Sequence, residues 1–170
     1  GRMVERDEYM ELVDRKTASL FAACARLGAI SGNATEDEEH RLGRFAWNLG
    51  VAFQLIDDVL DFTATEAVLG KPVGSDLREG KITLPLLLSL QHASPAERAD
   101  VEQVLKDRSY DHVPFARILE IVRRHNGVEL ARQEAQGFTA KANVLIEQFP
   151  DSPAQRALQS IPEFIVQREF

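Results

Sequence analysis

The 170-residue sequence contains a single cysteine, Cys24, and no run approaching the ~20 apolar residues that are needed to span a bilayer. A lone cysteine cannot form an internal disulfide. Because Cys24 lies in an apolar segment, we expect a buried thiol in a reducing compartment. The N-terminus also lacks the pattern of a secretory signal. These absences predict a cytoplasmic protein without a transmembrane segment.

An excess of basic residues is also missing. The chain has 27 acidic and 20 basic residues, which gives a formal net charge of −7. A nucleic-acid surface requires a clustered basic face, so we expect no nucleic-acid partner. Hydrolase and nucleotide-binding functions lack support, because the sequence has neither a Gly-x-Ser-x-Gly motif nor a P-loop. No zinc-site spacing connects the four histidines, which are His40, His92, His112 and His125.

The sequence shows no alternating strand pattern, internal repeat or low-complexity segment. Its periodicity is helical, which predicts an all-α helical bundle in one domain. Helices are expected over residues 6–27, 37–62, 84–90, 95–106, 114–125, 128–149 and 153–168. Three have capping signals at their N-termini, which are Thr35 with Glu38, Ser94 with Glu97, and Ser152 with Gln155. The acidic run at residues 36–39 is best explained by the dipole of the helix that it begins.

The first predicted helix, residues 6–27, has an apolar stripe and ends before Gly28. The stripe consists of Tyr9, Val13, Leu20, Cys24 and Leu27, which are spaced as on one helix face. Lys16 falls on this stripe. Its ammonium group either reaches solvent along the helix surface or points into a polar cavity, and the residues alone favour solvent.

Three carboxylates mark the second predicted helix, residues 37–62. Asp57, Asp58 and Asp61 have the spacing of neighbours on one side of a helix, next to its apolar face. Crowded carboxylates repel one another unless a cation binds them, and the hard ion Mg²⁺ prefers oxygen ligands. The lysines that follow, Lys71 and Lys81, suggest that a diphosphate accompanies the metal.

Residues 63–81 lose the helical periodicity and have glycines at short intervals, so we expect a long functional connection. On their own, Lys71 and Lys81 would be interpreted as surface lysines. Asp76 is expected to order this segment as a hydrogen-bond acceptor rather than to bind metal.

Taken together, FQ-x-x-DD-x-x-D at residues 53–61 and GK-x-x-G-x-D-x-x-x-GK-x-TLP at residues 70–85 form a specific pattern. It resembles the second aspartate-rich region of the trans-isoprenyl diphosphate synthases, the polyprenyl synthetase family. The similarity extends back to Tyr9 and the Lys16-Thr17 pair and weakly forward to the terminal QREF. That family carries another aspartate-rich motif upstream, and this chain has no second one. Residues 1–170 therefore resemble the C-terminal half of a single isoprenoid-synthase domain.

The resemblance implies a prenyltransferase that condenses an allylic prenyl diphosphate with isopentenyl diphosphate and releases diphosphate. It implies Mg²⁺ bound by Asp57, Asp58 and Asp61. Lys16 would line the allylic diphosphate site with Thr17, Lys71 would bind the diphosphate, and Lys81 would be a weaker companion. Thr17 and Gln54 resemble the residues that face the allylic cation.

The loop at residues 69–87 looks closest to the long-chain synthases of octaprenyl or solanesyl type. We also expect a homodimer, or self-association through inner helix faces that lack a partner. Two alternatives remain open: a non-catalytic diphosphate-binding subunit of a heteromeric synthase, and a terpene cyclase.

Overall fold

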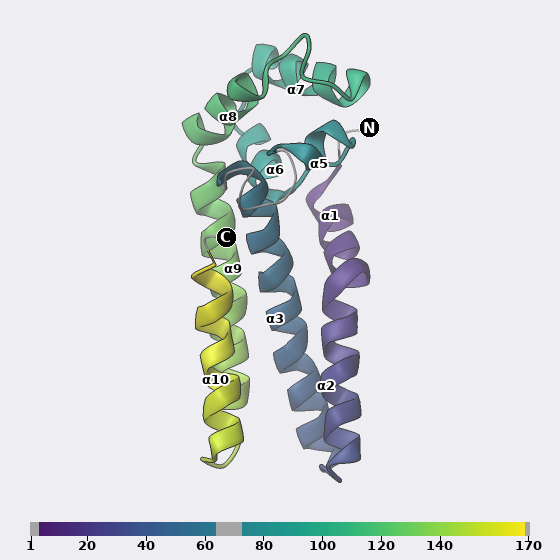
Figure 1. Ribbon diagram of the computed structural model, residues 1–170, viewed down its shortest axis with the longest axis vertical. Coiled ribbons are helices and arrows are strands. Elements are labelled where there is room, and N and C mark those ends of the chain that lie inside the picture. The colour runs from purple at the N-terminus through teal and green to yellow at the C-terminus, as the bar shows by residue number, and fades with distance from the viewer. Residues whose placement is uncertain (1–3, 64–72, 169–170) are drawn as a thin grey trace. The chain divides into compact units, whose positions relative to one another are not determined.

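The computed structural model describes residues 4–63 and 73–168, and the regular elements within these ranges are all helical (Figure 1). They are α1 (Arg6–Val13), the π-helical turn η1 (Asp14–Ala18), α2 (Ser19–Ser31), α3 (Glu36–Thr63), α5 (Ser75–Arg78), α6 (Leu84–Leu90), α7 (Pro95–Asp107), α8 (Phe115–Arg124), α9 (Gly127–Ile146) and α10 (Pro153–Val166). The all-α fold class is thus confirmed. No described helix combines the length and apolar character that crossing a membrane requires.

The chain divides into two compact units. Among the described residues, the aspartate unit comprises residues 4–9, 57–63 and 73–132, and the long-helix unit comprises residues 10–56 and 133–168. The division falls within α3, after Ile56, so this helix contributes residues to both units.

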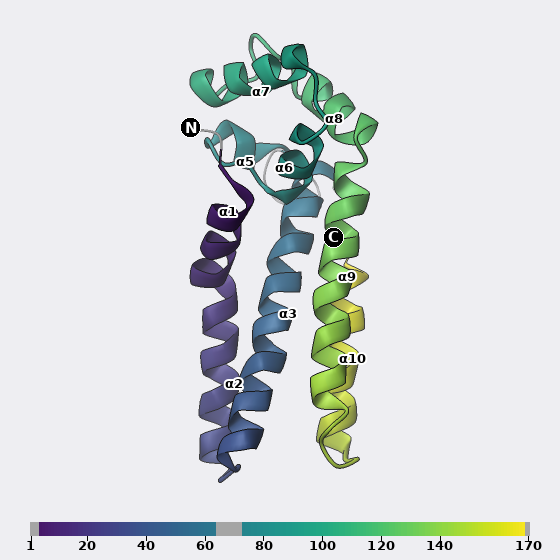
Figure 2. The ribbon, with the colours of Figure 1, turned by 180° about the vertical axis from the view of Figure 1, so that it is seen from behind.

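In the long-helix unit, α2 lies on one side of α3, and α9 and α10 lie on the other (Figures 1 and 2). The ring of Phe21 on α2 packs against Phe53 on α3, with centroids 5.8 Å apart. On the other side, Trp47 of α3 meets Phe138 of α9 at 6.0 Å. Gly50 lets α3 approach η1 closely, because a Cβ atom there would stand 2.7 Å from the Cα of Ala18.

In the aspartate unit, α5, α6, α7 and α8 are gathered together (Figure 2). A helix is found at residues 84–90 as predicted, and every residue of this helix, α6, is buried. Gly127, the first residue of α9, lies against α6, and a Cβ atom there would be only 2.1 Å from the carbonyl oxygen of Pro85. The fully buried side chains of this unit include Leu77, Leu84, Leu86, Val101, Val104, Ile118 and Ile121.

The predicted stripe of the first helix is wrong beyond Val13. Tyr9 and Val13 are buried, but Leu20 and Leu27 are each 63% exposed, and Cys24 is exposed rather than buried. The cause is η1. A π turn closes over one residue more than an α turn, so the buried face after it is displaced by about 100°. The inward position after Val13 is accordingly Ala18, five residues on. We call the exposed set Leu20, Cys24, Leu27 and Ile30 the outward stripe of α2.

The expected end of this helix at Gly28 is also wrong, because α2 continues to Ser31 with Gly32 as its C-cap. Gly28 stands in open space, where a Cβ atom would meet nothing within 4 Å. A short helix, α5, lies within the connection that was expected at residues 63–81. Its four residues are too few for a periodic pattern to reveal.

The capping predictions are confirmed. Ser94 and Glu97 form a complete capping box at the start of α7, and the Ser152 hydroxyl accepts a hydrogen bond from the Gln155 amide at the start of α10. At the start of α3, the Thr35 amide donates to Glu38 Oε2 at 2.8 Å. These hydrogen bonds from Thr35 lower the pKa of Glu38.

Candidate active site

The acidic side of α3 is more deeply buried than its sequence indicated. Asp58 is 3% exposed and Asp61 is 1% exposed, and a carboxylate buried to this extent is costly without hydrogen-bond donors. The hydroxyl of Tyr9 donates to Asp58 Oδ2 at 2.6 Å. This contact connects α1 to α3 within the aspartate unit and gives Tyr9 a defined role beside the motif.

Asp61 is held by the segment that begins α5. The Ser75 hydroxyl donates to Asp61 Oδ1 at 3.1 Å, and the backbone N–H of Asp76 donates to Asp61 Oδ2 at 3.3 Å. The backbone N–H of Gly74 also donates to the carbonyl oxygen of Asp61 at 3.0 Å. The aspartate-rich motif and the glycine-rich motif recognised in the sequence therefore meet at Asp61.

Asp57 differs from its two neighbours. It is half-buried, and we find no hydrogen-bond or ion-pair partner for its carboxylate among the described residues. Asp57 can therefore bind a ligand from outside the chain without first breaking a hydrogen bond to any residue that the structure describes.

The donor set fits a magnesium ion that takes only part of its ligands from the protein. Within residues 4–63 and 73–168, no three His, Cys, Asp or Glu side chains converge into a group that could hold a metal alone. Mg²⁺ is usually held by one or two carboxylates together with substrate phosphates and water. Asp57 meets this requirement directly. Asp58 and Asp61 lie on the same side of α3, with oxygens already oriented by protein donors.

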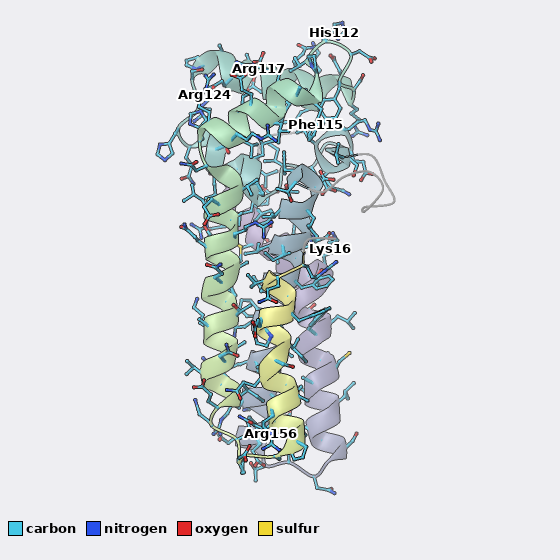
Figure 3. All side chains as sticks on the ribbon, turned by 60° about the vertical axis from the view of Figure 1, so that its left-hand side comes forward. Lys16, His112, Phe115, Arg117, Arg124 and Arg156 are labelled. Atoms are coloured by element: carbon cyan, nitrogen blue, oxygen red, sulfur yellow. The ribbon has the colours of Figure 1, made fainter. Side chains whose placement is uncertain are left out.

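The long-helix unit brings together two further predicted site residues. The Thr17 hydroxyl donates to Gln54 Oε1 at 2.9 Å, so η1 and α3 are joined by a polar contact between residues 37 positions apart. Lys16 also lies on η1, where it is exposed (Figure 3). π turns are rare and frequently occur at functional sites, which agrees with the position of the Lys16-Thr17 pair on one.

The lysines of the second motif have different outcomes. Lys71 lies outside the described residues. Lys81 is exposed, with its ammonium nitrogen 2.6 Å from Glu79 Oε2 and 3.7 Å from Asp76 Oδ1. The hydrogen bond with Glu79 and the charge of Asp76 raise the pKa of Lys81 above its usual value. The backbone carbonyl oxygen of Asp76 accepts the Lys81 N–H at 2.9 Å, so the segment is ordered at this residue by the backbone, and the role of the Asp76 side chain stays a prediction.

Sequence reasoning did not assign a role to Arg168, near the C-terminal end of the described chain. Its guanidinium lies over the ring of Phe53, 4.5 Å from the centroid, one residue before Gln54. Its Nη1 is buried and has no hydrogen-bond partner among the described residues. The weak similarity of the terminal QREF was the only signal in the sequence for this residue.

Comparison with known proteins assigns the family. The polyprenyl synthetase family model matches residues 2–122, which is well over half of the chain. The chain belongs to the polyprenyl synthetase family. This confirms the resemblance that was drawn from the two motifs.

Similar members of the polyprenyl synthetase family come from archaea and bacteria. The chain is 38% identical over 166 residues to the short chain isoprenyl diphosphate synthase of Methanothermobacter thermautotrophicus, covering 98% of this chain and 50% of that protein. It is 36% identical over 166 residues to the octaprenyl diphosphate synthase of Escherichia coli, covering 98% and 51%. The chain thus spans about half the length of the curated relatives it matches, and the match is to their C-terminal half.

A solved structure of the same family supports the fold assignment. It is a polyprenyl synthase from Caulobacter crescentus complexed with calcium and isoprenyl diphosphate. The two chains are 34% identical with a TM-score of 0.91, over 98% of this chain and 51% of that one.

Proposed function

We propose that this chain is the C-terminal part of a single helical prenyltransferase domain, which condenses an allylic prenyl diphosphate with isopentenyl diphosphate and releases diphosphate. One observation carries the proposal. In a member of the polyprenyl synthetase family, an accessible carboxylate, Asp57, stands next to two carboxylates that protein donors hold in place.

The difficult step in such a reaction is the separation of a carbocation from an anionic leaving group. Bound Mg²⁺ would supply a positive charge that stabilises the departing diphosphate. The chain's part is to hold that ion with Asp57, Asp58 and Asp61. Tyr9 and Ser75 keep the two buried carboxylates in fixed orientations, so little reorganisation is needed when ligand binds. The calcium and isoprenyl diphosphate in the related structure are consistent with such a site.

Thr17 and Gln54 are proposed to face the allylic cation. The Thr17 hydroxyl donates a hydrogen bond to Gln54 Oε1, so the lone pairs of the hydroxyl oxygen can face positive charge. Lys16 would bind the allylic diphosphate, with Lys71 and, more weakly, Lys81 as further contacts. These roles rest on the family resemblance. Lys16, Thr17 and Gln54 belong to the long-helix unit, whereas Lys81 belongs to the aspartate unit.

A second candidate is a subunit of a heteromeric synthase. It is favoured by a relative named heptaprenyl diphosphate synthase component 2, from Bacillus subtilis, which is 33% identical over 95% of this chain. Product length is not assigned by the relatives, whose names range from short-chain to octaprenyl enzymes. A long-chain product therefore remains a prediction, as does a cytoplasmic location.

The sequence predicted self-association through inner helix faces, but the exposed apolar residues of the first helix form the outward stripe of α2. We therefore propose that this stripe is covered by protein in the functional assembly, through a homodimer or self-association. Leu20 and Leu27 are apolar and each is 63% exposed, so covering them with protein is more favourable than leaving them in water. Sedimentation of the chain would show a concentration-dependent increase in mass. A variant with Leu20→Ser and Leu27→Ser should remain monomeric, and an equal tendency to associate would contradict the proposal.

The activity is tested by combining this chain with the half of a relative that the chain does not span. The chain is coexpressed with the N-terminal half of the Escherichia coli octaprenyl diphosphate synthase, and the complex receives Mg²⁺, an allylic diphosphate and radiolabelled isopentenyl diphosphate. We expect longer prenyl diphosphates from the complex and none from the chain alone, because positioning and water exclusion require both halves. Asp57→Asn in the same complex is the control.

The other possible results are informative. Turnover by the chain alone would show that one aspartate-rich motif suffices and would refute the mechanism. A cyclic hydrocarbon would identify a terpene cyclase. If neither the chain nor the complex binds diphosphate in the presence of Mg²⁺, the proposed function is wrong.

A further inference from the structure

A tyrosine far from both sequence motifs contacts the segment that holds Asp61. Tyr110 lies in the connection between α7 and α8, and its hydroxyl donates to the carbonyl oxygen of Gly74 at 2.6 Å. This contact joins residues 36 positions apart within the aspartate unit. Gly74 is the N-cap of α5 and is bonded on both sides, because its own N–H donates to Asp61 at 3.0 Å.

The shape of the contact requires glycine. Gly74 has a φ of +68°, which residues other than glycine rarely adopt because it strains their backbone. A Cβ atom at this position would stand 2.3 Å from Phe115 Cε2 and 2.8 Å from the Tyr110 hydroxyl. The two rings therefore close directly on the Gly74 backbone.

Three aromatic rings form a continuous row of contacts that ends on α3. The rings of Tyr110 and Phe115 meet edge to face with centroids 5.4 Å apart, and Phe115 stacks on Phe62 at 6.2 Å. Phe115 is the first residue of α8 (Figure 3), and Phe62 is the residue after Asp61 on α3. Tyr110 thus packs against Phe115, whose ring in turn stacks on the helix that carries the acidic motif.

The phenol of Tyr110 keeps its proton at neutral pH. Burial, and then the negative charge of Asp61, raise the pKa of Tyr110 well above its usual value. The hydroxyl consequently stays protonated and can serve as a donor to the carbonyl oxygen of Gly74.

We propose that Tyr110 is a positioning residue for the acidic motif. By holding the Gly74 carbonyl, it keeps Ser75 and the Asp76 amide aligned on the Asp61 carboxylate, and so fixes the orientation of that carboxylate for Mg²⁺-dependent diphosphate binding. This inference rests on the proposed function for its ligand, and on the hydrogen bonds of Tyr110, Ser75 and Asp76 for its geometry.

The test compares Tyr110→Phe with a matched control. Tyr110→Phe keeps the ring packing and removes only the donor. Ser89→Ala removes another buried hydroxyl of the same unit, whose hydrogen bond goes to the backbone carbonyl of Pro85 at 2.7 Å and not to the acidic motif. Calorimetric titration with inorganic diphosphate is carried out on each chain at several Mg²⁺ concentrations, and unfolding midpoints are recorded in parallel.

We expect the Mg²⁺ concentration needed for half-maximal diphosphate binding to rise roughly three- to tenfold in Tyr110→Phe, the effect of about one lost hydrogen bond. Ser89→Ala should lower the unfolding midpoint without changing the Mg²⁺ dependence. Equal Mg²⁺ dependence in Tyr110→Phe and the unsubstituted chain would overturn the proposal, whatever the loss of stability.

A second measurement separates this inference from the proposed function. If the unsubstituted chain binds no diphosphate with Mg²⁺, the ligand assignment fails, but amide hydrogen exchange still tests the positioning. The amides of Gly74 and Asp76, both bonded to Asp61, should exchange several-fold faster in Tyr110→Phe than in Ser89→Ala. Equal exchange in the two variants would refute the hold of Tyr110 on this segment.

Discussion

Gly50→Ala should destabilise the long-helix unit, although alanine is the better helix former. Gly50 lies within α3 at the point where this helix meets η1. The added Cβ atom would stand 2.7 Å from the Cα of Ala18 and 3.1 Å from the Cβ of Phe21. The nearer atom belongs to the backbone, so a change of side-chain rotamer cannot relieve the contact. η1 and α3 must therefore move apart.

The magnitude follows from two opposing effects. Carbon atoms pack best at about 3.5–4.0 Å, so the helices must separate by roughly 1 Å. Overpacking of this kind costs about 1–3 kcal/mol, whereas replacing a helical glycine by alanine gains about 1 kcal/mol. The difference is a net loss of up to about 2 kcal/mol. For a chain of this size that lowers the melting temperature by up to roughly 8 °C.

The assay is thermal and urea unfolding followed by circular dichroism, with Gly137→Ala as the control. Gly137 lies within α9, where a Cβ atom would meet nothing within 4 Å, so this variant shows the gain in helix propensity alone. It should be more stable than the unsubstituted chain by up to about 1 kcal/mol. If Gly50→Ala is as stable as Gly137→Ala, the close approach of α3 to η1 is wrong. Separation of these elements should also lengthen the Thr17–Gln54 hydrogen bond, which is 2.9 Å here.

Three further predictions concern charged side chains. Asp57→Asn should lower turnover of the assembled enzyme by orders of magnitude with almost no change in unfolding midpoint, because no described residue forms a hydrogen bond or ion pair with this carboxylate. Near-normal turnover would exclude Asp57 as a metal ligand. Lys16→Ala should weaken the affinity for the allylic diphosphate, measured by calorimetry, about ten- to a hundredfold, since a charge-assisted bond to phosphate contributes roughly 1.5–3 kcal/mol. Unchanged affinity would assign Lys16 to the solvated surface. Hydrogen bonds from Ser94, followed by that from His125, lower the pKa of Glu97 from 4.5 to about 2, so its stabilising contribution is complete above pH 4.5 and is lost as the pH falls toward 2. Glu97→Gln should therefore melt below the unsubstituted chain at pH 7, and a difference in melting temperature that stays constant down to pH 2 would contradict this.

The acidic helix could be predicted from local periodicity. Phe45, Leu49, Ile56 and Leu60 form its buried apolar face, and the carboxylates lie beside this face as expected. The predicted helix at residues 37–62 is found as α3, Glu36–Thr63. Such agreement is expected where a long helix repeats one pattern over many turns and is capped by side chains close in sequence.

The rest depends on tertiary packing that local patterns do not contain. The five residues of η1 have no signature that separates a π turn from an α turn, and this one extra residue moved Leu20, Cys24 and Leu27 out of the buried face. The hydrogen bond between Tyr110 and Gly74 joins distant segments. Neither residue carries a mark in its own sequence neighbourhood that identifies its partner.

The exposure of Cys24 makes this chain suited to site-specific labelling. It is the only cysteine in the sequence, and it lies on the outward stripe of α2 between Leu20 and Leu27. A maleimide fluorophore or a nitroxide spin label would therefore attach at one known position without any substitution. Its mobility would fall, and the reactivity of the free thiol would decrease, whenever another polypeptide covers the stripe. Assembly could then be followed in real time with the native thiol as the reporter.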